Sequence, residues 1–217
     1  MQPTGARAIK AIVFDLDGTL YVSPSFAATI QDAAVIYMAA LKGMVPDEMR
    51  ELMGATRARL TEGSGMLPTL SAVCTELGGN MHDLHAFFKE HLRPEEHLVR
   101  DDRVTTLLER LQSRYALYIY TNNNHAVTAR IIACLGFENL FEQVFAIDDL
   151  WRAKPDEARL DQIIKSTGYA PEEILFVGDR FDVDLRLPEQ KGCPIYLSQS
   201  VDQLLRLDGV LTSSKDR

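Results

Sequence analysis

Two aspartates that are one residue apart, Asp15 and Asp17, directly follow a short apolar segment near the start of the chain. Three later apolar segments are also followed by polar or charged side chains. In chain order these side chains are Thr121 and Asn122, then Lys154, and then Asp179, Asp182 and Asp184. If the segments are strands of one parallel sheet, we expect these groups to meet, because such sheets bind ligands beyond the carboxyl ends of their strands.

Aspartates gathered at one point need a cation, because carboxylates within a few ångströms of each other repel. Mg²⁺ fits such a set, since it takes carboxylate, carbonyl and water oxygens. One carboxylate of the Asp15 and Asp17 pair could then stay ionised as a nucleophile, while the other holds a proton as acid or base. Thr121 and the backbone N–H groups after it could hold phosphate oxygens at a helix N-terminus. Lys154 could neutralise charge that builds in the transition state.

Five short apolar segments have the length and composition of buried parallel strands. They are Lys10–Phe14, Ala116–Tyr120, Gln143–Ile147, Ile174–Val177 and Pro194–Leu197. Helical periodicity separates or follows the later ones, over residues 101–114, 125–135, 156–166 and 201–207. This alternation predicts an α/β fold with a doubly wound, Rossmann-like parallel sheet of about five strands.

The segment 23–97 interrupts this alternation, because it is far longer than one crossover helix. It contains four stretches of helical periodicity and no convincing strand. We therefore predict an all-helical cap domain at 23–97, inserted after the first strand. The α/β catalytic core then consists of residues 1–22 and 98–217.

Four short motifs in this order are similar to those of a known family. DLDGT at 15–19, TN at 121–122, KP at 154–155 and GDRFDVD at 178–184 resemble the haloacid dehalogenase (HAD) superfamily, in its phosphatase form with a helical cap between the first and second motifs. The sequence is also similar to two narrower branches, the pyrimidine 5′-nucleotidase-like and the phosphoglycolate phosphatase-like enzymes.

The resemblance implies a role for each motif residue. Asp15 corresponds to the nucleophile that forms an aspartyl-phosphate, and Asp17 to the general acid and base. Lys154 corresponds to the catalytic lysine that also contacts the phosphate, together with Thr121 and Asn122.

The same resemblance implies a Mg²⁺ site. Its ligands would be Asp15, Asp17 through its backbone carbonyl, Asp179 and Asp184. Asp182 competes with Asp184 for the role of the last acid of the fourth motif, and the sequence leaves both open.

The function that the resemblance implies is Mg²⁺-dependent hydrolysis of phosphomonoesters, with a small phosphorylated metabolite or a nucleotide as substrate. Haloalkanoate dehalogenases of the family lack an aspartate at the position of Asp17, so this residue favours phosphoryl chemistry. Two alternatives stay open: a phosphomutase of the same fold, and a phosphate-binding regulatory module without turnover. The oligomeric state is open as well.

Composition limits the partners and the compartment. A net charge of −8 argues against binding to a nucleic acid polymer or to an anionic membrane surface. Three scattered cysteines and a first segment, MQPTGARAIK, without an apolar stretch lead us to expect a cytoplasmic protein.

Four histidines between residues 82 and 97 suggest a zinc site. They have no cysteine or carboxylate cluster beside them, so we expect ordinary helix residues.

Overall fold

The computed structural model describes residues 8–213, and the ends 1–7 and 214–217 of the predicted core lie outside the described residues. A five-stranded sheet forms the centre of the molecule, with the strand order β3-β2-β1-β4-β5 and parallel pairing throughout. Its strands are β1 (Ala11–Phe14), β2 (Ala116–Tyr120), β3 (Gln143–Phe145), β4 (Ile174–Gly178) and β5 (Ile195–Leu197). The predicted α/β fold with a parallel sheet of five strands is confirmed.

The register of the sheet brings three strand ends together. β1 lies between β2 and β4, and Phe14 is level with Ile119 on one side and with Val177 on the other. The residues that follow these three positions therefore leave the same edge of the sheet. Ligands of open parallel sheets bind at this edge.

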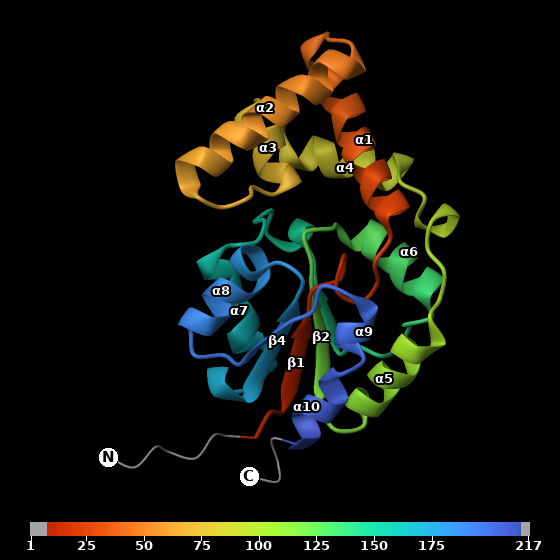
Figure 1. Cartoon of the computed structure of the whole chain (residues 1–217), viewed down its shortest axis with the longest axis vertical. Coiled ribbons are helices and arrows are strands. Elements are labelled where there is room, and N and C mark those ends of the chain that lie inside the picture. Colours follow the sequence, from red (N-terminus) through yellow and green to blue (C-terminus); the bar gives the residue numbers. More distant parts are fainter. Residues whose placement is uncertain (1–7, 214–217) are drawn as a thin grey trace.

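Both faces of the sheet are buried, which explains why its strands are continuously apolar. Alternate residues of β1 point to opposite faces: Ile12 and Phe14 belong to one hydrophobic core, and Ala11 and Val13 belong to another. The first face is covered by α5 (Asp102–Gln112), α6 (His125–Leu135), α9 (Val201–Leu204) and α10 (Leu207–Ser213), and the second by α7 (Glu157–Thr167) and α8 (Arg186–Gln190) (Figure 1). The sheet is therefore doubly wound.

Several elements begin or end one or two residues from their predicted bounds, and one predicted helix is divided. The third strand ends at Phe145 instead of Ile147, because Ile147–Asp149 form a 3₁₀ turn. The helix predicted at 201–207 is divided into α9 and α10. Element ends are set by local capping and tertiary contacts, which apolar periodicity does not encode.

The segment between β1 and α5 is helical, as the sequence predicts, and its role as a separate cap domain stays a prediction. Its helices are α1 (Pro24–Lys42), α2 (Pro46–Ser64), α3 (Leu70–Glu76) and α4 (Met81–His91), and they lie together beyond the carboxyl ends of the strands (Figure 1). The Ser23, Thr69 and Asn80 side chains each accept a hydrogen bond from a backbone N–H in the first turn of the helix that follows.

Several side-chain contacts join the segment 23–97 to the core, and two of them involve α4. The Asn124 side chain donates a hydrogen bond to the backbone oxygen of His85 over 2.9 Å. The ring of Trp151 stacks on His82 with the centroids 3.8 Å apart.

Within residues 8–213, no helix is long and apolar enough to cross a membrane.

Candidate active site

The chain leaves β1 in a tight turn that carries the first motif. Asp15 is buried at the strand end, and the hydroxyl group of Thr19 donates to its Oδ2 over 3.0 Å. Gly18 has φ = +86°, which favours glycine, and a Cβ atom there would lie 2.6 Å from Asp179 Oδ2. The turn therefore requires glycine both for its conformation and for the close approach of Asp179.

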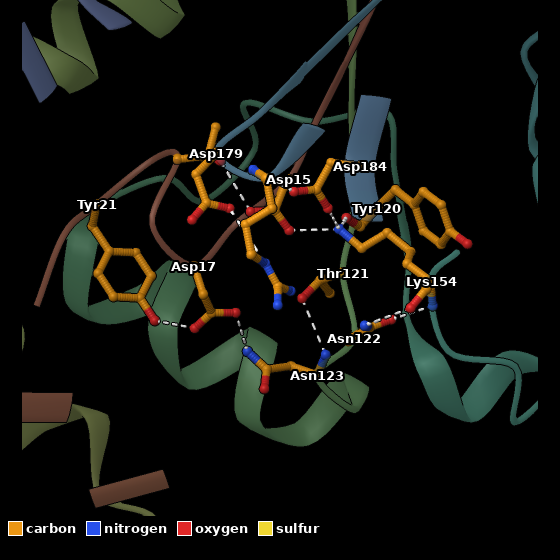
Figure 2. Close-up of polar contacts among 12 residues, drawn as sticks. Asp15, Asp17, Tyr21, Tyr120, Thr121, Asn122, Asn123, Lys154, Asp179 and Asp184 are labelled. Carbon is orange, nitrogen blue, oxygen red and sulfur yellow. Dashed lines mark hydrogen bonds and ion pairs between the residues drawn. The ribbon is translucent and has the colours of Figure 1, made fainter. Parts of the chain in front are cut away.

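Lys154 joins this strand end to the fourth motif. Its Nζ donates to Asp15 Oδ1 over 2.6 Å, to Asp184 Oδ1 over 2.7 Å and to the backbone oxygen of Tyr120 over 2.9 Å (Figure 2). The lysine is buried. Burial alone would lower the pKa of Lys154, but the carboxylates of Asp15 and Asp184 raise it above its ordinary value. Lys154 is therefore held as a cation between two acids.

Three carboxylates form an acidic cluster at this point. One oxygen each from Asp15, Asp179 and Asp184 lies within 4.8 Å of the other two. Asp184 rather than Asp182 takes part, because the π-helical turn Phe181–Leu185 buries Asp184 and the backbone N–H of Arg180 donates to its Oδ2 over 3.1 Å. Asp182 is only partly buried and lies outside the cluster.

The charge of this cluster exceeds what Lys154 neutralises. Burial, together with the other aspartates and against the opposing effect of Lys154, raises the pKa of Asp15 to about 7. Burial and the Asp184 carboxylate raise the pKa of Asp179 to about 6. Asp179 Oδ1 is buried and has no hydrogen-bond partner among the described residues. An oxygen without a donor, in an all-oxygen set, is the environment that a hard divalent cation takes.

Asp17 lies beside this cluster with its side chain held separately. The Tyr21 hydroxyl group donates to Asp17 Oδ1, and Asn123 Nδ2 donates to Oδ2 over 2.6 Å (Figure 2). Burial raises the pKa of Asp17, although the Tyr21 hydrogen bond and the charges of Lys154 and Arg180 oppose it. Its carboxylate is therefore fixed in direction, and its proton affinity is higher than that of an ordinary aspartate.

Thr121 and Asn122 leave the end of β2 next to Lys154. Thr121 is buried, and its hydroxyl oxygen accepts a hydrogen bond from the backbone N–H of Asn123 over 3.1 Å. Asn122 Oδ1 accepts from the backbone N–H of Lys154 over 2.7 Å, so this side chain positions the lysine. The N-cap of α6 is Asn124, which leaves the Thr121 hydroxyl group free of that capping role.

The structure thus brings together the residues that the sequence singled out after four strands, except Asp182, which lies outside the acidic cluster. Three further contacts were not predicted: Thr19 to Asp15, and Tyr21 and Asn123 to Asp17. Tyr21 lies four residues after Asp17, but nothing in the sequence indicates that its hydroxyl group turns back. The acidic cluster is the only group of three or more possible metal ligands within residues 8–213, so the cap histidines form no such site.

A cleft of about 410 Å³ opens beside Asp17 and Asp179, between the cap and the core. The core contributes Gly18, Asn122, Asn123 and Arg180 to its walls, and the cap contributes Phe26, Ile30, Arg57, Leu70, His85 and Phe88. A ligand in this cleft contacts both domains. Its volume is typical of a site for a small molecule.

These features define a hydrolase of a known class. The chain belongs to the haloacid dehalogenase-like hydrolase family, whose model matches residues 9–189. It is similar to phosphoglycolate phosphatase of Vibrio cholerae, with 29% identity over 195 residues that cover 86% of this chain and 83% of the relative. It is also similar to glyceraldehyde 3-phosphate phosphatase of Methanopyrus kandleri, with 25% identity over 198 residues that cover 85% and 81%.

Among solved structures, the chain is similar in fold to the HAD hydrolase YfnB of Bacillus subtilis. The TM-score is 0.60 at 19% identity, and the match covers 95% of this chain and all of the other. Family and relatives together identify the protein as a phosphatase of the HAD superfamily, with likeness to its phosphoglycolate phosphatase-like branch. The similarity to the pyrimidine 5′-nucleotidase-like branch stays a prediction.

Proposed function

We propose that the protein hydrolyses small phosphate monoesters through a covalent phosphoryl intermediate on Asp15, with Mg²⁺ bound at the acidic cluster. One observation carries the proposal: Asp15 lies between a buried lysine and two further carboxylates, with Asp17 fixed alongside. Neither a purely structural ion pair nor a helix cap requires this arrangement.

Asp15, Asp179 and Asp184, together with the backbone carbonyl of Asp17, would hold the metal ion. The Asp179 Oδ1 atom, which has no hydrogen-bond donor among the described residues, and the raised pKa values of Asp15 and Asp179 support this assignment. Bound Mg²⁺ would keep these carboxylates ionised and neutralise negative charge on the phosphoryl oxygens. The similar YfnB structure was determined bound to magnesium.

In the first step, an Asp15 oxygen attacks phosphorus and the bond to the ester oxygen breaks. Asp17 gives its proton to the departing oxygen, which leaves as an alcohol. Its raised pKa supports this role, since a proton must be present on the carboxyl group when the ester binds. Lys154 stabilises the charge on the phosphoryl group, and Thr121 with the N–H groups near Asn122 holds its oxygens.

In the second step, ionised Asp17 takes a proton from a water molecule, and the resulting hydroxide attacks phosphorus. The bond between phosphorus and the Asp15 oxygen breaks, which releases inorganic phosphate and restores both side chains. A phosphomutase would instead return the phosphoryl group to a second hydroxyl group of the substrate. The phosphatase relatives favour water as the acceptor.

The experiment is a phosphate-release assay on a panel of small esters, with Mg²⁺ or with excess EDTA, for the natural chain and for Asp15→Asn. We expect release that requires Mg²⁺ and is abolished in the variant, while circular dichroism stays unchanged. Phosphate release by Asp15→Asn at the natural rate would contradict the proposed nucleophile. Conversion of an ester to its isomer without free phosphate would identify a mutase.

A further inference from the structure

The aromatic ring of Tyr120, the last residue of β2, lies beside the ammonium group of Lys154. Lys154 Nζ is over this ring, 5.0 Å from its centroid, which is within the range of a cation–π interaction. The same Nζ donates to the backbone oxygen of Tyr120 over 2.9 Å. The ring is buried, and a cation–π interaction is stronger there than at an exposed site. Tyr120 therefore contacts the ammonium group in two ways.

The hydroxyl group of Tyr120 does not explain this placement. It is buried without a hydrogen-bond partner among the described residues, and it points away from the Lys154 ammonium group (Figure 2). Burial raises the pKa of Tyr120 to about 12, although the charge of Lys154 opposes this, so the hydroxyl group is neutral at pH 7. Lys154 is thus attracted by the face of a neutral ring and not by a phenolate.

A similar arrangement occurs on the neighbouring strand. Phe145 of β3 is level with Tyr120, and the guanidinium group of Arg159 lies over its ring, 5.5 Å from the centroid. Arg159 is buried as well, and it forms an ion pair with Asp149. Two buried cations from the segment 154–159 therefore lie against two aromatic rings on the same face of the sheet.

The hydrogen-bond acceptors of Lys154 do not keep their charge during the proposed reaction. An ammonium group has three N–H donors, and Asp15, Asp184 and the Tyr120 backbone accept one each. The carboxylate of Asp15 loses its charge when it takes up the phosphoryl group. Of these three acceptors, only Asp184 would then carry a charge, so the lysine would have an ionic partner on one side alone. The attraction of the ring does not depend on the state of Asp15.

We propose that Tyr120 is a positioning residue, whose ring face holds the Lys154 ammonium group at the phosphoryl site through both steps of the reaction. This inference rests on the proposed phosphatase function and adds a residue to it. Tyr120 does not line the cleft, so it acts through Lys154 and not on the substrate. Because a displacement of about 1 Å near the reacting atoms can cost about 10²-fold in rate, a weaker hold on the lysine should lower kcat.

The test weakens the ring face while the packing stays nearly the same. Fluorine atoms withdraw electron density from an aromatic face and so weaken its attraction for a cation, and they change the size of the ring little. Tyr120→Phe is compared with the same replacement made with 4-fluoro-, 3,5-difluoro- and 3,4,5-trifluorophenylalanine, and with Tyr120→Leu. The matched control is the fluorinated series at Phe176, a buried ring of the same core over which no cation lies among the described residues.

The values kcat and KM are measured with p-nitrophenyl phosphate and Mg²⁺. From Tyr120→Phe to the trifluorinated ring, we expect kcat to fall stepwise by about 10-fold in total, while KM stays within about 2-fold. Tyr120→Leu should lower kcat at least as far, because it removes the ring altogether. The trifluorinated ring at position 176 should leave kcat within about 2-fold.

A constant kcat across the fluorinated series at position 120 overturns the inference, even if Tyr120→Leu is inactive, because a role in packing alone predicts that result. An equal fall of kcat in the series at position 176 overturns it as well. In both cases, Mg²⁺-dependent phosphate release by the natural chain keeps the proposed function intact. Failure of the natural chain to hydrolyse any ester, with Mg²⁺ present, contradicts the phosphatase proposal instead.

Discussion

Lys154 Nζ and Asp15 Oδ1 lie 2.6 Å apart, and both side chains are buried at the end of the central strand. This pair connects the motif after β1 with the segment before α7, which are 139 residues apart in the chain. Among the described residues, the lysine is the one side-chain cation in hydrogen-bond contact with the acidic cluster, so the ionisation of Asp15 depends on it.

Replacement of this lysine by a neutral side chain should therefore lower the catalytic rate strongly and the stability of the fold moderately. For Lys154→Met with Mg²⁺, we expect kcat/KM to fall by about 10³-fold or more, since a preorganised charge at the phosphoryl group is lost. Without metal, the free energy of unfolding at pH 7 should fall by roughly 3 kcal/mol, because two buried carboxylates lose their partner. Steady-state kinetics and urea unfolding measure the two effects. Lys165→Met, at an exposed position of α7, is the control, and equal losses in both variants would contradict this role.

The raised pKa values of the cluster predict a pH dependence of stability in metal-free protein. The pKa of Asp15 rises from 3.8 to about 7 on folding, so its stabilising contribution is complete below pH 4 and is lost as the pH rises through 7. Asp179, with a pKa of about 6, acts in the same direction. In excess EDTA, the free energy of unfolding should therefore fall by on the order of 2–4 kcal/mol as the pH rises from about 4 to about 7.

Two comparisons separate the cluster from other titrating groups. His85 has the opposite dependence, because its pKa is lowered to about 4 and its contribution is lost as the pH falls through that value. The titration of His85 changes the stability of the natural chain and of Asp15→Asn equally, so it cancels in the difference between them. In EDTA at pH 7.5 we expect Asp15→Asn to be the more stable of the two, and saturating Mg²⁺ should reverse or remove the difference. A variant that is less stable in EDTA would contradict the account of a cluster in need of a cation.

The hydrogen bond from Tyr21 to Asp17 should tune the proton affinity of the acid. Loss of this donor in Tyr21→Phe removes a contact that favours the ionised carboxylate, so the pKa of Asp17 should rise further. Because protonated Asp17 is needed when the ester binds, the descending limb of the profile of kcat/KM against pH should move to higher pH. Tyr37→Phe is the control, since the Tyr37 hydroxyl group bonds only to the backbone of Asn80 among the described residues. If the descending limb lies at the same pH in Tyr21→Phe as in the natural chain, the hydrogen bond from Tyr21 does not set the pKa of Asp17.

The sequence predicts the core of this molecule well because the signals there are local and strong. Continuous apolar segments indicate buried parallel strands. The residues that follow parallel strands lie at the same edge of the sheet. The expected meeting of four such residues follows from this topology; they are Asp15, Thr121, Lys154 and Asp179. The four stretches of helical periodicity correspond to the four helices α1 to α4, and α3 begins at Leu70, directly after the capping Thr69.

Other features depend on tertiary geometry that the sequence does not encode locally. The choice between Asp182 and Asp184 follows from a π-helical turn, which rotates the second carboxylate inward. The bond between Asn123 and Asp17 spans 106 residues. The surroundings of Arg57 also emerge only in the fold: its Nη2 donates to the neutral Gln31 side chain, whereas its helix neighbours Arg50 and Arg59 form ion pairs with Asp32 and Glu76.

The central claim, a phosphoryl intermediate on Asp15, is tested most directly by a burst experiment with Asp17→Asn and p-nitrophenyl phosphate. This ester has a leaving group that needs no proton, so the first step survives in the variant while the attack of water, which needs a base, is slowed by about 10²-fold or more. We predict a burst of one p-nitrophenolate per active site, followed by slow turnover. Borohydride reduction during the burst should convert residue 15 to homoserine, as detected by peptide mass spectrometry. A linear time course without a burst, or a label at any other residue, would contradict the account.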